Sequence, residues 1–107
     1  MIVKNKSIGR QKAGDGVERK ILARGGELMM VEVSFEKGAV GAVHRHPHQQ
    51  VSFVLKGSFE LDIGGVNEII RAGDSFYVPA DAPHGVLALE PSAILDVFTP
   101  QRQDFLK

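Results

Sequence analysis

The sequence contains no cysteine, and its 13 Lys and Arg residues balance its 13 Asp and Glu residues. Without cysteine, the chain forms no disulfide and offers no thiolate to a metal. The balanced charge, the lack of a basic run and the low aromatic content of 7% disfavour a nucleic-acid partner. No long apolar stretch at the N-terminus marks a signal peptide or a membrane span. We therefore expect a soluble cytoplasmic protein with no nucleic-acid or membrane partner.

Helical periodicity is also missing, and alternation of apolar and polar residues takes its place. A chain of 107 residues with 43% hydrophobic content has room for one domain, residues 1–107, with one core. Short alternating segments separated by Gly and Pro predict an all-β sandwich or barrel. The predicted strands cover residues 29–36, 51–55, 58–63, 66–71, 75–78, 85–90 and 93–99.

The histidines are concentrated in a way that indicates a metal site. Three of the four, His44, His46 and His48, fall within five residues, and His84 follows the turn 79–83. On an extended strand a His-x-His pair points both rings to one face, and a distant third ligand is then needed to complete the coordination. His84 can supply that ligand. The alternative is an adventitious patch of surface histidines.

Two segments resemble the two motifs of the cupin family. Residues 38–57 read Gly, five residues, His-x-His, three residues, Gln, six residues, Gly, and Gln50 stands where the motif usually has glutamate. Residues 73–88 read Gly, five residues, Pro-x-Asp, two residues, His; Asp81 replaces the usual glycine, and Ala88 stands where asparagine is common. Two motifs in the right order are stronger support than either alone.

The cupin resemblance implies a small double-stranded β-barrel of the jelly-roll kind that holds one divalent transition metal, of which Zn, Ni, Mn and Fe are candidates. The implied ligands are His44, His46, Gln50 and His84. By composition Gln49 is an equal candidate for the fourth position, and only the motif spacing favours Gln50. Pro47 interrupts strand pairing, so His48 is placed outside the ligand set. Four neutral ligands leave the metal charge unneutralised, which favours an anionic substrate.

The C-terminal strand, residues 93–99, carries one charge in an apolar run. Alternation places Ile94, Asp96 and Phe98 on one face of this strand. An isolated carboxylate among apolar side chains costs several kcal/mol unless it is paired or neutralised, so Asp96 indicates a chemical task. The structural alternative is an ion pair between Asp96 and Arg102 that pins the tail across the barrel.

The segments 44–50, 83–86 and 95–106 resemble the KdgF family of pectin-degradation cupins. The resemblance implies a metal-dependent enzyme that opens the ring of 4,5-unsaturated monouronates, released from pectin or alginate by lyases, to give 4-deoxy-5-keto uronates. Two positions depart from the family: Gln49 stands where acidic residues are frequent, and Ser52 replaces a polar amide that contacts ligand. These departures concern substrate preference more than the class of activity.

The family's aspartate, phenylalanine and arginine correspond to Asp96, Phe98 and Arg102. We expect Asp96 to move the proton between the anomeric hydroxyl and the developing enol carbon. Arg102 is expected to grip the substrate carboxylate through its planar fork. Phe98 is expected to form an apolar wall of the sugar pocket, although by composition an ordinary core position explains it equally well.

Two other functions stay open on the sequence alone. An iron oxygenase would use the same three histidines but has no evident need for Asp96 or Arg102. A non-catalytic cupin that binds a sugar acid would use the metal and the arginine without chemistry. We also expect a homodimer, because the polar stretch 4–20 has few apolar residues and is suited to docking on a neighbouring subunit.

Overall fold

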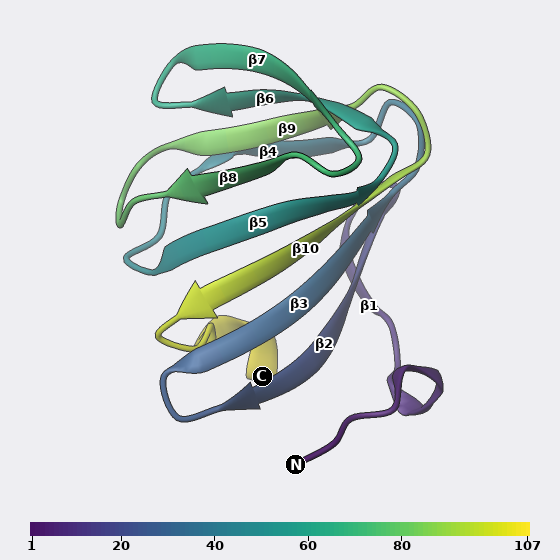
Figure 1. Ribbon diagram of the computed structural model, residues 1–107, viewed down its shortest axis with the longest axis vertical. Helices are drawn as coiled ribbons and strands as arrows, with labels where there is room; N and C mark the ends of the chain where they lie inside the picture. Colours follow the sequence, from purple (N-terminus) through teal and green to yellow (C-terminus); the bar gives the residue numbers. More distant parts are fainter.

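The computed structural model describes all 107 residues, and β-strands make up most of the chain (Figure 1). The strands are β1 (Gln11–Gly14), β2 (Val17–Gly25), β3 (Leu28–Phe35), β4 (Val40–His44), β5 (Gln49–Lys56), β6 (Ser58–Ile63), β7 (Val66–Arg71), β8 (Ser75–Val78), β9 (His84–Ala88) and β10 (Ser92–Thr99). Two short 3-10 helices, η1 (Asn5–Ser7) and η2 (Gln103–Leu106), flank them. Neither helix has the length or the hydropathy of a membrane span. The all-β prediction is confirmed.

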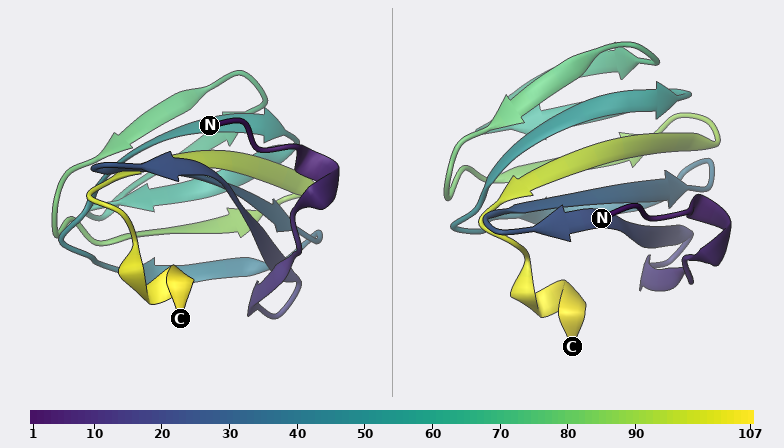
Figure 2. Two further views of the ribbon diagram at one scale, coloured as in Figure 1. Left: turned by 90° about the horizontal axis from the view of Figure 1, so that it is seen from below. Right: turned by 60° about the horizontal axis from the view of Figure 1, so that its bottom comes forward.

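The strands form two antiparallel sheets that face one another (Figure 2). The six-stranded sheet has the order β1-β2-β3-β10-β5-β8, and the four-stranded sheet has the order β4-β9-β6-β7. Strand β10 lies in the middle of the larger sheet and pairs with both β3 and β5. Because the strands next to β10 come from distant parts of the chain, residues far apart in sequence meet on its inner face.

The core lies between the sheets and follows the predicted alternation. Met29, Val31 and Phe35 on β3 point inward, and Ile94 and Phe98 on β10 do the same. The core has two clusters, a larger one that includes Phe35 and Ile94 and a smaller one of Met29, Val31 and Phe98. Side chains of η2 pack against the smaller cluster, so the C-terminal helix closes that end of the inner face.

Three strands are not among those predicted. β1, β2 and β4 carry charged, glycine or exposed residues that hide a period of two, and backbone pairing with neighbouring strands holds them in the sheets. Strand β2 pairs with β3 along most of its length. Within the stretch 4–20, β1 and the start of β2 are paired in their own chain, whereas residues 4–10 lie outside the sheets and are mostly exposed, and the homodimer stays a prediction.

Two turns explain unusual sequence positions. A two-residue hairpin joins β6 and β7 at Gly64–Gly65, and the φ values of +57° and +88° explain why both residues are glycine. Asp81, which stands where cupins usually have glycine, has a φ of +63°. The left-handed backbone at this position accounts for the usual glycine, and aspartate is among the residues that tolerate it.

Candidate metal centre and pocket

Three histidines converge at one end of the two-sheet core. His44 ends β4 and stands directly opposite His84, the first residue of β9. His46 follows β4, and the ligating nitrogens of the three rings all lie within 4.8 Å of one another. The sequence-based grouping is confirmed, but its reason holds only in part: β4 ends at His44, so the turn after it, and not strand alternation, brings His46 to the cluster.

Each of the three rings is oriented by a backbone carbonyl. Nδ1 of His44 donates to the carbonyl of Ala42 at 2.9 Å, and Nδ1 of His84 donates to that of Ala82 at the same distance. Nδ1 of His46 donates to the carbonyl of His48 at 3.1 Å. Since a carbonyl only accepts, Nδ1 carries the proton and Nε2 of each neutral ring keeps its lone pair. This arrangement is the usual support of metal-binding histidines.

Burial keeps two of these rings neutral. Desolvation lowers the pKa of His46 below its ordinary value of 6.5, and the positive charge of Arg102 lowers it further. Desolvation is also the main reason that the pKa of His84 is lowered. Neutral imidazole is the form that binds a metal, so the site is prepared for a cation at neutral pH.

Gln50 on β5 completes the cluster. Its side chain is buried, and its Oε1 lies 3.1 Å from Nε2 of His46. Its Nε2 donates to Ser52 Oγ at 2.9 Å and to Asp96 Oδ1 at 3.2 Å, so the amide oxygen is turned toward the histidines. With Nδ1 of His46 protonated, two acceptors face one another at His46 and Gln50, a contact that a shared cation satisfies. These residues fit a divalent metal ion.

The two other candidate ligands lie differently. Gln49 is exposed, and its Oε1 accepts a hydrogen bond from the Tyr77 hydroxyl at 2.8 Å. His48 is partly buried, and its Nδ1 has no hydrogen-bond partner within the chain. The ring of His48 stands edge-on to Phe98, with centroids 6.4 Å apart, while its carbonyl orients His46. Of the two glutamines that composition left open, Gln50 is the one beside the histidines.

Asp96 lies on the inner face of β10 and accepts a hydrogen bond from the Gln50 amide. Ser52 Oγ donates to Asp96 Oδ1 at 2.6 Å, in addition to the Gln50 amide. Burial raises the pKa of Asp96 from 3.8 to about 6, although the Ser52 and Gln50 hydrogen bonds oppose this shift. A carboxylate with this pKa is ionised at pH 7 and accepts a proton readily, as a general base must.

Arg102 is buried, but its partner is not Asp96. Its Nε and Nη2 donate to the two carboxylate oxygens of Asp104 at 3.0 and 2.8 Å. The structural alternative of an ion pair between Asp96 and Arg102 was therefore wrong. The planar fork expected to grip a substrate is also largely engaged by Asp104, which leaves Nη1 as the edge of Arg102 without a hydrogen bond in the chain.

Phe98 fits both interpretations made from the sequence. It is only 2% exposed and packs with Met29 and Val31 in the smaller core cluster. One part of its ring also borders the pocket and stands edge-on to His46, with centroids 5.7 Å apart. The guanidinium of Arg102 lies 5.1 Å from the centroid of the same ring. Phe98 therefore joins the core to the wall of the site.

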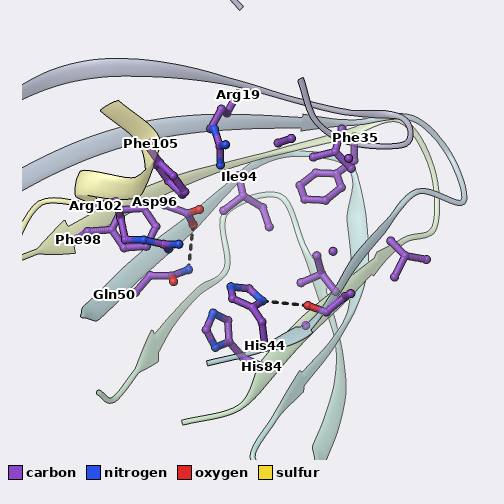
Figure 3. Close-up of a pocket in the computed structure, with 18 of the residues that line it drawn as sticks. Arg19, Phe35, His44, Gln50, His84, Ile94, Asp96, Phe98, Arg102 and Phe105 are labelled. Atoms are coloured by element: carbon purple, nitrogen blue, oxygen red, sulfur yellow. Dashed lines mark hydrogen bonds between the residues drawn. The ribbon is translucent and has the colours of Figure 1, made fainter. Parts of the chain in front are cut away.

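A cavity of about 460 Å³ between the sheets connects these residues (Figure 3). The predicted residues that line it are His44, Gln50, His84, Asp96, Phe98 and Arg102. Arg19 and Phe105 line it too, and neither was predicted. The shared parity of Val17, Arg19 and Ile21 could have indicated that Arg19 points inward, had β2 been recognised as a strand.

The fold and this histidine-lined pocket define a small cupin with a candidate metal site. The chain matches the cupin domain family over residues 31–98 and belongs to that family. It also belongs to the KdgF family: the pectin degradation protein KdgF of Dickeya dadantii (strain 3937) is 44% identical over 98 residues, which are 90% of this chain and 89% of the relative.

Two solved structures agree with this assignment. KdgF from Halomonas sp. is 38% identical with a TM-score of 0.93, and the match covers 98% of this chain and 97% of that one. An RmlC-like cupin from Shewanella frigidimarina NCIMB 400 is also 38% identical with a TM-score of 0.93, over 97% of this chain and 94% of that one. The family predicted from the sequence is thereby confirmed.

Proposed function

We propose that this protein is a metal-dependent enzyme that opens the ring of 4,5-unsaturated monouronates from pectin or alginate breakdown and yields 4-deoxy-5-keto uronates. The observation that carries the proposal is the Asp96 carboxylate beside the histidine cluster, in one pocket of a KdgF-family chain. A cytoplasmic location, expected from the sequence, stays part of the proposal.

One divalent transition metal would be held by His44, His46, Gln50 and His84. The three oriented imidazoles and the amide oxygen turned toward them support this set. Nitrogen and oxygen ligands of this kind suit Zn, Ni, Mn or Fe. When bound, the ion supplies Lewis-acid polarisation of substrate oxygens and positive charge for an anionic sugar.

Ring opening moves one proton and breaks one bond. The substrate is a cyclic hemiacetal whose ring oxygen is part of an enol ether. Asp96 would accept the proton of the anomeric hydroxyl as the bond between the anomeric carbon and the ring oxygen breaks, which leaves an aldehyde and an enolate. Asp96 would then return the proton to the carbon end of the enolate, so that the ketone forms and atoms balance. The hydrogen bonds from Ser52 and Gln50 hold the carboxylate in position for both transfers.

The remaining pocket residues would bind the sugar. Phe98 offers an apolar ring edge beside His46, suited to a ring face of the substrate. Arg102 contributes positive charge at the same end, with Asp104 fixing its orientation. The two carboxylate contacts of Arg102 leave it a positioned cation with one free edge, so its contribution is to binding more than to the proton transfer.

The direct test is loss of the substrate's ultraviolet absorbance. The conjugated double bond of an unsaturated galacturonate monomer absorbs, and ring opening destroys that chromophore. Metal-loaded wild-type protein is expected to accelerate the loss well above the rate in buffer, without consuming oxygen. An unchanged chromophore with each of Zn, Ni, Mn and Fe would leave a binding protein, and oxygen uptake with iron would indicate an oxygenase.

A homodimer is also part of the proposal, through the outer face of the six-stranded sheet. That face exposes neighbouring apolar side chains on β5 and β8, namely Val51, Phe53, Leu55 and Tyr77. A contiguous exposed apolar patch is typical of an interaction site. A second copy of the chain can cover it by a two-fold contact of the same face.

Phe53→Glu is expected to convert the dimer into a monomer, because it places a charge at the centre of this patch. Light scattering at micromolar concentration measures the change in mass. Val66→Glu is the matched control, since Val66 is an exposed apolar residue on β7 of the other sheet. A wild type that is already monomeric, or a Phe53→Glu protein that stays dimeric, would contradict the proposed interface.

A further inference from the structure

Arg19 reaches the pocket from a strand that the ligand and family motifs do not include. On β2 it stands opposite Val33 of β3, and Val33 stands opposite Ile94 of β10. Directly opposed residues point to the same face of a sheet, so Arg19 shares the inner face with Ile94. Arg19 and Ile94 both line the cavity, and Ile94 lies two residues before Asp96.

Most N–H donors of the Arg19 guanidinium have no hydrogen-bond partner in the chain. Its only hydrogen bond within the chain runs from Nε to Gln11 Oε1 at 3.2 Å, and no carboxylate lies within ion-pair distance. Nη1 and Nη2 are therefore free. The Arg19 guanidinium stacks on the Phe105 ring, with Cζ 3.8 Å from the ring centroid. Stacking and the Gln11 hydrogen bond hold this cation in place without neutralising it.

Arg19 and Arg102 form a pair of like charges at this end of the pocket. Phe105 contacts both guanidinium groups, since Arg102 Cζ lies 4.2 Å from the centroid of the same ring. Burial lowers the pKa of Arg19, and the charge of Arg102 lowers it further. The single carboxylate in contact with the pair, Asp104, is engaged by Arg102. The charge of Arg19 therefore has no ion-pair partner in the chain.

Figure 3 shows how these groups are arranged around the cavity. Arg19 and Phe105 lie on one side of it, and His44 and His84 lie on the opposite side, with Asp96 between them. A monouronate that presents its anomeric end to the histidines and Asp96 would turn its carboxylate toward the arginines. We infer that Arg19 binds the substrate carboxylate and, together with the free edge of Arg102, selects acidic sugars over neutral ones.

This inference rests on the proposed function for the substrate class, and a binding experiment separates the two. Calorimetry compares metal-loaded wild type and Arg19→Gln with D-galacturonate and with its uncharged methyl ester. We expect the wild type to prefer the acid and Arg19→Gln to lose about 10- to 100-fold of that preference, because a charge-assisted contact is lost. Arg24→Gln, on the same strand but outside the pocket, is the matched control and is expected to keep the preference.

Kinetics supply the second readout. With unsaturated galacturonate, Arg19→Gln is expected to raise KM by a similar factor while kcat and metal content change little. An unchanged acid preference in Arg19→Gln, or a wild type without that preference, would overturn the inference even if ring opening occurs. Conversely, an Arg19-dependent preference in a wild type that opens no ring would refute the proposed function and leave the assignment of Arg19 standing.

Discussion

Asp96→Asn is expected to lower kcat for ring opening by about 10²–10⁴-fold, the usual contribution of a positioned proton acceptor. The amide keeps the shape of the carboxylate and its Oδ1 can still accept from Ser52 and Gln50, but it cannot take the anomeric proton. The rate of chromophore loss at saturating substrate measures the effect. Metal content, determined by elemental analysis on the same sample, is expected to stay near the wild-type value.

Stability of the metal-free protein provides the control for this substitution. The folded-state pKa of Asp96 lies above the ordinary value of 3.8, at about 6, so the folded chain favours the protonated form. Protonated Asp96 therefore adds at most ~3 kcal/mol to the free energy of unfolding. This contribution is fully present below pH 3.8 and is lost as the pH rises through 6. Asn has no charge to bury, so chelator-treated Asp96→Asn is expected to be at least as stable as wild type at pH 8 in urea unfolding.

The two measurements distinguish a catalytic carboxylate from a structural one. A residue kept for chemistry is held at the expense of stability, and its replacement lowers kcat without weakening the fold. A lower kcat together with a marked loss of stability at pH 8 would instead mean that Asp96 only orients Gln50. Full activity in Asp96→Asn would remove it from the mechanism.

The parts of the site that the sequence predicted are those governed by local spacing. His44 and His84 were found because the histidines gather in two short segments that also match the cupin motifs, and the structure places the two residues opposite one another. Asp96 was found because a lone charge in an alternating strand is visible in one segment. In each case the informative residues lie within a few positions of one another or in a motif of fixed length.

The parts that were missed depend on pairing between distant segments. Arg19 enters the pocket only because β2 joins the larger sheet beside β3, and the charged residues of β2 hide its alternation. Asp104 was missed as the partner of Arg102 because the short helix η2, which carries it, has no periodicity that a sequence pattern can detect. Both cases involve tertiary contacts that override a weak local preference.

Loss of a histidine ligand is the other change with a large expected effect. Wild-type protein is expected to contain about one divalent ion per chain, and His84→Ala is expected to lose most of the metal and to reduce ring opening to the buffer rate. Removing one of three nitrogen ligands from a small site leaves His44 and His46 with too few partners to hold the ion. Elemental analysis after metal reconstitution and dialysis measures occupancy, and the absorbance assay measures activity.

His48→Ala is the matched control. It removes the imidazole of His48, which is only two residues from His46 but is not part of the histidine cluster. The backbone carbonyl of residue 48 orients His46 and survives the substitution, so metal content and activity are expected to fall little. Equal losses in His48→Ala and His84→Ala would show that the cation is not held by the convergent Nε2 atoms. Full occupancy in His84→Ala would place the metal elsewhere, and the electrostatic basis for binding an anionic sugar in this pocket would then rest on Arg19 and Arg102 alone.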